Sequence, residues 1–291
     1  MIKFGPSGNG KIFYEEGHKH TIEAPKWCKE HGLDCYEYSF GRGFTIKPEN
    51  AKLIGDEAIK NDVLISVHAP YYISLGNENL ETYDKNFNYI AKSLDYLKLF
   101  GGKKCVVHPG SCGKQPREKA FETSKKQMDY ILEKYYQNNY DGLFICPETM
   151  GKSMQLGSVS EIIELCKMDK CLIPTFDFGH INCFTQGSLK TEQDYRNILE
   201  FALAELGEYK TKNLHIHFSK IEYTSKGEVK HLTLEDKVYG PEFEPLAKVI
   251  KDMKLEPTII SESKEIMMED AMKLNKYGKT FRLQPLTSCG I

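Results

Sequence analysis

Short apolar segments alternate with longer segments of helical periodicity along the chain. Eight apolar runs of strand length recur at intervals of roughly 30 to 45 residues. They cover residues 2–8, 35–40, 64–70, 104–110, 143–149, 172–180, 214–220 and 257–263. The periodicity between them predicts helices over residues 86–100, 117–136, 191–206 and 242–253. In the first of these helices, the apolar residues that fall near one face are Phe87, Ile90, Leu94, Leu97 and Phe100.

This alternation predicts a parallel sheet closed into a single (β/α)₈ TIM barrel that spans residues 1–291. Neither a Pro/Ser-rich linker nor a low-complexity tract divides the chain. The alternative is an open doubly wound sheet, which normally carries a GxGxxG loop after its first strand. The segment GPSGNG at residues 5–10 contains glycines but does not fit that pattern. The closed barrel is therefore the favoured architecture.

Composition and charge narrow the function classes only slightly. The 291-residue chain is 40% hydrophobic and 27% charged, which is typical of a globular protein, and its formal net charge is -2. This charge gives no general attraction to nucleic acid. Without a long apolar run or a secretory signal, we expect a cytoplasmic protein without membrane association. The nine cysteines are odd in number and form no CxxC pair, so we expect reduced thiols.

Histidines and acids stand at the carboxyl ends of six consecutive strand-like runs. They are His68, His108, Glu148, Asp177 with His180, His215 with His217, and Glu262. The carboxyl ends of parallel barrel strands meet at one rim, where catalytic residues gather. We therefore expect these side chains to line one pocket. So many anions at a desolvated rim would repel one another unless cations lay between them.

Imidazole mixed with carboxylate, without thiolate, is a donor set that suits Zn²⁺, with Mn²⁺ or iron as alternatives. A carboxylate such as Glu148 or Glu262 can bridge two ions, because each of its oxygens can bind a different one. The pattern thus predicts a site with more than one metal ion.

Six motifs resemble those of the endonuclease IV family of apurinic/apyrimidinic endonucleases, within the wider group of xylose-isomerase-like barrels. They are SVHAPYY (66–72), VVHPGS (106–111), PETMGK (147–152), DFGH (177–180), HIHFSK (215–220) and ISES (260–263). They follow the family's order over nearly the whole chain.

The resemblance implies two to three Zn²⁺ per chain. One would be bound by His68 and His108, and Glu148 would bridge it to a second. That second ion would be held by Asp177, Glu262 and a histidine of the seventh strand. The spacing to Glu262 favours His217, whereas alignment on the trailing Ser-Lys favours His215. Both side chains point to the same face of a strand, so this choice stays open.

The third ion implied by the resemblance would be bound by His180 and His231. The family carries an aspartate two positions before its last histidine, and this chain has Val229 there. The longer side chain of Glu228 could take its place. The segment FSK after the seventh-strand histidine also stands where the family has an Asn-Asp pair.

The resemblance further implies hydrolysis of DNA 5′ to an abasic site in base excision repair, with Glu148 and Glu262 as catalytic residues. Two cations a few ångströms apart can activate a water molecule and stabilise the attacking and leaving oxygens of a phosphodiester. The expected partner is double-stranded DNA with an abasic site. Arg42, Tyr71 and Tyr72 would contact it from loops of the rim. We expect no protein partner and a monomer.

The competing hypothesis is a sugar isomerase or epimerase of the same barrel group. It would need one metal, held by Glu148, Asp177, His217 and Glu262, while the two glutamates moved a proton. The additional histidines His68 and His108 favour the nuclease, because a mononuclear isomerase does not need them. A third possibility is a barrel that only binds nucleic acid or sugar and has no enzymatic activity. Nothing in the sequence supports it, because no ligand of the two-metal core is missing. Trp27 is predicted to lie in the core, and Lys125–Gln127 on a solvated helix face.

Overall fold

Eight parallel strands close into a barrel in the computed structural model, which describes residues 1–280. The strands of the barrel are β1 (Lys3–Pro6), β2 (Cys35–Ser39), β3 (Leu64–His68), β4 (Lys104–Val107), β5 (Phe144–Pro147), β6 (Thr175–Asp177), β7 (His215–Phe218) and β10 (Thr258–Ser261). They form two ladders, β2-β3-β4-β5 and β6-β7-β10-β1. Bridges between Ser7 and Glu37 and between Glu148 and Thr175 join the ladders at both seams. The predicted (β/α)₈ barrel is thereby confirmed.

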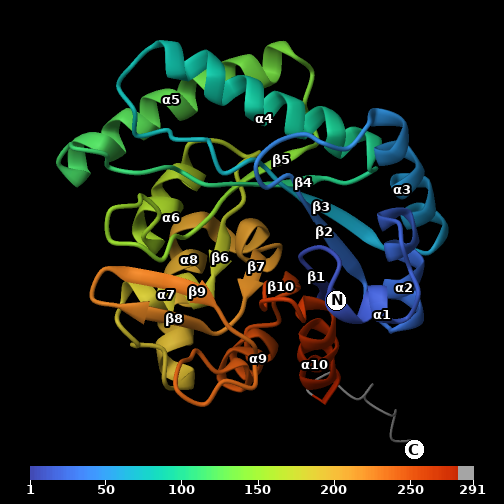
Figure 1. Cartoon of the computed structure of the whole chain (residues 1–291). Helices are drawn as coiled ribbons and strands as arrows, with labels where there is room; N and C mark the ends of the chain where they lie inside the picture. Colours follow the sequence, from blue (N-terminus) through green and yellow to red (C-terminus); the bar gives the residue numbers. More distant parts are fainter. Residues whose placement is uncertain (281–291) are drawn as a thin grey trace, which may run out of the picture.

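The helices cover the outside of this ring of strands (Figure 1). They are α1 (Lys11–Glu15), the 3₁₀ turn η1 (Thr21–Glu23), α2 (Ala24–Glu30), α3 (Pro48–Lys60), α4 (Glu81–Leu99), α5 (Arg117–Gln137), α6 (Val159–Lys167), α7 (Phe178–Phe184), α8 (Glu192–Lys212), α9 (Phe243–Asp252) and α10 (Met267–Thr280). No helix within the described residues combines the length and apolar character needed to cross a bilayer.

The apolar faces of the helices pack against the outward side chains of the strands. The predicted apolar face of α4 is buried as expected, from Phe87 to Phe100. Trp27 of α2 is fully buried, and the ring of His31 stacks on it with centroids 3.8 Å apart. On the predicted solvated face of α5, Lys126 is exposed, whereas Gln127 is buried and donates to the carbonyl of Asn77. The eight cysteines among the described residues are buried free thiols, and Cys289 lies outside these residues.

The sixth strand is shorter than the predicted run 172–180. It ends at Asp177, and α7 begins at Phe178. The Asp177 side chain caps this helix by accepting a hydrogen bond from the backbone N–H of His180 at 2.8 Å. His180 consequently lies in the first turn of a helix and not in the strand.

A hairpin follows the seventh strand, in a segment for which the periodicity predicted neither a strand nor a helix. Strands β8 (Ile221–Thr224) and β9 (Gly227–His231) pair antiparallel and lie beside α7 at the rim (Figure 1). The pairing shifts by one residue between Glu222 and Tyr223, so that Val229 is an extra residue on β9. Such a bulge changes which side chains share a face of the strand.

Strand register brings polar side chains to matching heights inside the barrel. Ser39 lies opposite His68, and Asp177 lies opposite His217. Side chains alternate between the two faces of a strand, so His215 and His217 point inward, while the intervening Ile216 is buried among the hydrophobic core. The barrel thus carries a column of polar residues from its centre to its carboxyl-end rim.

Candidate metal centre

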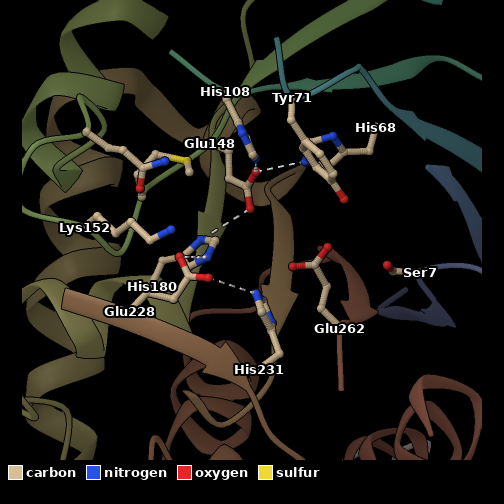
Figure 2. A pocket seen from close by; sticks show the side chains of 12 residues that line it. Ser7, His68, Tyr71, His108, Glu148, Lys152, His180, Glu228, His231 and Glu262 are labelled. Atoms are coloured by element: carbon tan, nitrogen blue, oxygen red, sulfur yellow. Dashed lines mark hydrogen bonds and ion pairs between the residues drawn. The ribbon is translucent and has the colours of Figure 1, made fainter. Parts of the chain in front are cut away.

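A cavity of about 520 Å³ opens at the carboxyl ends of the strands. Figure 2 shows imidazoles and carboxylates that point into it from opposite walls. It is lined by Ser7, His68, Tyr71, His108, Glu148, Met150, Lys152, Gln155, His180, Glu228, His231 and Glu262. Of the eight side chains expected to line one pocket, five line this cavity, namely His68, His108, Glu148, His180 and Glu262. Asp177, His215 and His217 are buried and lie outside its lining.

The Glu148 carboxylate lies at the junction of two groups of histidines. Its Oε2 atom is 3.1 Å from Nε2 of His68 and 3.0 Å from Nε2 of His108. Its Oε1 atom is 2.9 Å from Nδ1 of His217 and 3.6 Å from Nδ1 of His180. Burial would raise the pKa of Glu148, but the surrounding imidazoles hold this pKa well below its usual range. The two oxygens thus face two different sets of nitrogen donors.

The first two sets of potential metal ligands share Glu148. One consists of His68, His108 and Glu148, and the other of Glu148, Asp177, His217 and Glu262. In each set the ligand atoms lie within 4.8 Å of one another. His217 belongs to the second set, whereas His215 lies outside it.

The environment of Asp177 fits a cation. Its Oδ2 atom is buried and accepts no hydrogen bond, although Nδ1 of His180 lies 3.2 Å away. Burial raises the pKa of Asp177 to about 6 against the opposing effect of His180, and the nearby Glu262 and Glu148 carboxylates add to the rise. A buried acceptor without a donor is costly unless a positive charge satisfies it. The residues present therefore fit the divalent ions that the donor set indicates.

A third set of potential ligands lies between α7 and the hairpin, and consists of His180, Glu228 and His231. Nε2 of His180 is 3.5 Å from Glu228, and Nε2 of His231 is 3.9 Å from it. The bulge at Val229 explains why Glu228 takes the position expected of an aspartate. Because of the extra residue, Glu228 and His231 face the cavity although they are three positions apart, while Val229 is 50% exposed.

Hydrogen bonds outside the cavity orient several of the imidazoles. Nδ1 of His68 lies 2.8 Å from the carbonyl of Ala69, and Nδ1 of His180 lies 3.0 Å from the carbonyl of Thr149. A carbonyl can only accept, so both rings carry a proton on Nδ1. Nδ1 of His231 lies 2.8 Å from the Ser219 hydroxyl. In all three residues Nε2 is left to face a carboxylate of the cavity, which is the arrangement of metal-binding histidines.

The residues predicted to contact DNA occupy different environments. Tyr71 lines the cavity, and its ring stacks on His108 with centroids 5.4 Å apart. Tyr72 is turned away and packs near Tyr89 of α4 at 6.1 Å. Arg42 is exposed on the loop after β2, outside the cavity lining. The backbone N–H of Tyr71 donates to the carbonyl of Gly41 and so links the two loops.

Sequence analysis missed two groups of polar residues at the site. Lys152 and Gln155 line the cavity from the loop after β5. Glu37 and Ser66 form a buried layer beneath it together with His215, which sequence analysis did name as a candidate. The signal for this layer was present, because Glu37 shares its strand face with Cys35 and Ser39, and this polar face points into the barrel.

The family model described as "Xylose isomerase-like TIM barrel" matches residues 25–276. The chain belongs to this family. An uncharacterized protein of Methanocaldococcus jannaschii is 30% identical over 95% of this chain and 96% of its own length. A probable endonuclease 4 of Lachnoclostridium phytofermentans is also 30% identical, but over 54% of this chain and 51% of that protein. The chain thus matches about half the length of this endonuclease 4 relative.

Solved structures with the same fold have different enzyme names. A D-tagatose 3-epimerase-like protein superposes with a TM-score of 0.68 at 22% identity, covering 96% of this chain and 97% of that one. Endonuclease IV from Thermus thermophilus has a TM-score of 0.66 at 18% identity, again covering 96% and 97%. At these identities the similarities establish the fold alone.

Proposed function

We propose that this protein is a metal-dependent endonuclease that hydrolyses the DNA phosphodiester 5′ to an abasic site, as in base excision repair. The observation that carries the proposal is the position of Glu148, whose two oxygens face separate sets of histidines. Two of the three ligand sets contain Glu148, and the third contains Glu228. The site thus offers ligands for three ions. Zn²⁺ suits these donors best, and Mn²⁺ is an alternative.

Divalent ions held by these residues would supply a water nucleophile at neutral pH and neutralise charge on the phosphate. The chain's own residues position these events. Glu148 holds the two sets together, while Glu262 presents a partly exposed carboxylate at the cavity wall. Burial would raise the pKa of Glu262, but His217 lowers it to about 2, so this group would act as a metal ligand and not as a proton donor at neutral pH. The proposed catalytic roles of Glu148 and Glu262 are therefore to bind and orient.

The rim offers groups that suit DNA. Lys152 lines the cavity opposite Ser7 and Glu262 (Figure 2), where its ammonium group can contact a phosphate. The Tyr71 ring lies over His108 and is 54% exposed, which leaves its surface free for an unstacked base or deoxyribose. Arg42 would contact the backbone from the neighbouring loop. These contacts would supply the local attraction that a net charge of -2 does not.

The test is a nicking assay on a duplex with one tetrahydrofuran residue as an abasic-site analogue. The expected result is a single cut on the 5′ side that leaves a 3′ hydroxyl, loss of the cut after chelation, and recovery with Zn²⁺ or Mn²⁺. Metal analysis of the same sample should give two to three ions per chain. A duplex that stays intact with the metal sites filled would contradict the proposal.

The second candidate is a metal-dependent sugar isomerase or epimerase. Glu148, Asp177, His217 and Glu262 form a set that could hold one ion without the other two sets. This function predicts one metal per chain and epimerisation of a ketose. We favour the nuclease because a mononuclear isomerase would not use the ligand sets around His68 and Glu228.

A further inference from the structure

A layer of buried polar side chains lies directly beneath the candidate metal centre. Glu37, His215 and His217 are fully buried at the centre of the barrel. Oε2 of Glu37 accepts a hydrogen bond from the Ser66 hydroxyl at 2.7 Å and lies 2.8 Å from Nε2 of His215. These two contacts fix the carboxylate from the side away from the cavity. Burying a carboxylate costs free energy of folding, which indicates that this layer has a role beyond packing.

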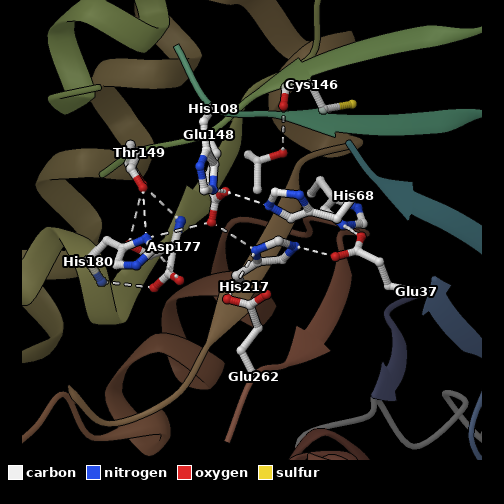
Figure 3. Close-up of polar contacts among 12 residues, drawn as sticks. Glu37, His68, His108, Cys146, Glu148, Thr149, Asp177, His180, His217 and Glu262 are labelled. Atoms are coloured by element: carbon white, nitrogen blue, oxygen red, sulfur yellow. Dashed lines mark hydrogen bonds and ion pairs between the residues drawn. The ribbon is translucent and has the colours of Figure 1, made fainter. Parts of the chain in front are cut away.

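The remaining oxygen of Glu37 faces His217. Oε1 of Glu37 lies 2.9 Å from Nε2 of His217, and neither atom has another partner among the described residues. The contact is close but is not aligned as a straight hydrogen bond. On the other side of the same ring, Nδ1 faces Glu148 at 2.9 Å and Glu262 at 3.4 Å (Figure 3).

In His217 the roles of the two ring nitrogens are exchanged relative to His68 and His180. His68 and His180 turn Nδ1 to a backbone carbonyl and Nε2 to the cavity. His217 turns Nε2 away from the cavity and Nδ1 towards it, and it meets a carboxylate where the other two meet a carbonyl. A carboxylate behind a metal-binding histidine fixes the ring's orientation and makes the opposite nitrogen a stronger donor.

We infer that Glu37 is a positioning residue for the metal centre, which holds His217 with Nδ1 towards the cavity and is itself held by His215 and Ser66. This inference rests on the metal centre of the proposed function. Glu37 is fully buried and does not line the cavity, so its effect on the metal centre would pass mainly through His217, the site residue that it contacts. A fourth ion bound by Glu37, His215 and His217 is the competing explanation, because their ligand atoms also lie within 4.8 Å of one another.

The competing explanation fits the surroundings poorly. The Lys104 ammonium group lies at the opposite end of the barrel, where it donates to the carbonyl of Asn213 at 2.8 Å and approaches the Thr258 hydroxyl. The positive charge of Lys104, on the side of the layer away from the cavity, would disfavour a metal ion bound by Glu37, His215 and His217. The layer is also closed to solvent, since Glu37, His215 and His217 are 0% exposed.

The test compares Glu37→Gln with Glu161→Gln, titrated with Zn²⁺ against a chromophoric chelator. Glu161 is also a buried glutamate, but it pairs with Arg117 at 2.6 Å and does not line the cavity. The expected result is that Glu37→Gln weakens one Zn²⁺ site by about 10- to 100-fold, with the total number of sites unchanged. Glu161→Gln should keep the affinity of the native protein. Glu37→Asp, which keeps the charge, should recover part of the loss.

Each outcome decides a different question. Equal Zn²⁺ affinity of the two variants would overturn the role of Glu37 while leaving the proposed function intact. Loss of one whole ion in Glu37→Gln, together with the same loss in His215→Ala, would overturn it in favour of a fourth ion. Weakened binding in a protein that never nicks the tetrahydrofuran duplex would support the role of Glu37 and contradict the proposed function. A native protein that binds no Zn²⁺ would contradict both.

Discussion

At the scale of single residues, the candidate site depends on which atom of a side chain faces which neighbour. Glu148 offers one oxygen to His68 and His108 and the other to His217, so its two oxygens serve two purposes. Three histidines have one ring nitrogen engaged outside the cavity, which leaves the other nitrogen available. Because these arrangements are fixed within the chain, changes at single atoms should have separable effects.

Glu148→Gln should abolish most of the nicking activity. The amide keeps the size of the side chain but removes the charge and turns one acceptor into a donor, which cannot bind a cation. We expect a fall in the nicking rate of about 10³-fold or more, together with a lower metal content. Rates on the tetrahydrofuran duplex and metal analysis of the same preparation check this. A variant that keeps its metal and loses less than tenfold in rate would argue against the bridging role.

Tyr71→Ala and Tyr72→Ala form a matched pair. The two residues are adjacent and similarly exposed, at 54% and 52%, but only Tyr71 lines the cavity. If Tyr71 stacks on the opened site, its loss should raise KM for the abasic duplex by about tenfold and leave kcat nearly unchanged. Tyr72→Ala should change KM less, because its ring packs near Tyr89. Equal effects of both substitutions would place the DNA contact elsewhere on the rim.

At the scale of elements, sequence periodicity predicted the existence of all eight barrel strands and of four helices. The bounds of α5 and α9 were predicted closely, whereas α4 begins five residues before its predicted start and α8 ends six residues after its predicted end. This prediction succeeded because a short apolar run between two amphipathic helical segments fits few structures other than a buried strand. It failed at Asp177, where an apolar run continues across the strand end and only the helix cap marks the boundary. It also failed at β8 and β9, which are short strands at the rim with partly exposed side chains.

The candidate ligands were also predicted from the sequence, but their grouping depended on the resemblance. Glu37 was missed although it shares a polar strand face with Cys35 and Ser39, because the sequence alone does not show that this face points into the barrel. The choice between His215 and His217 could not be made from alternation, because both point inward. This choice required the position of each ring along the barrel axis. In the strand register Asp177 lies opposite His217, so His217 is the histidine at the level of the other ligands.

The bulge of the hairpin gives a prediction at this scale. Exchanging Glu228 with Val229, as Glu228→Val with Val229→Glu, preserves composition and charge but moves the carboxylate to the position that is 50% exposed. We expect the loss of one metal ion per chain and a slower nicking rate, because His180 and His231 would lack their carboxylate. Exchanging Val229 with Lys230 is the control, because Glu228 and His231 stay in place. Unchanged metal content after the first exchange would show that the third set holds no ion.

At the scale of the whole molecule, the candidate ligands come from six of the eight barrel strands or the residues that follow them. His68, Glu148, Asp177, His217 and Glu262 are separated by up to 194 residues in sequence and share one cavity or border it. Such a site exists only when the barrel is closed. Metal binding and folding should therefore be coupled, since the unfolded chain offers no preformed site.

Removal of metal should consequently lower the stability of the barrel as a whole. A site that binds only the native state adds about 4 kcal/mol when the free ion is about a thousandfold above its Kd, which would raise Tm by roughly 10 °C for a chain of this size. Calorimetry of chelated protein and of the same protein reloaded with Zn²⁺ measures this difference. In Glu148→Gln the difference should shrink, because that variant loses the carboxylate shared by two ligand sets. If the chelated and reloaded native protein melted together, the rim residues would be a hydrogen-bonded network without metal, and the coupling between site and fold would be disproved.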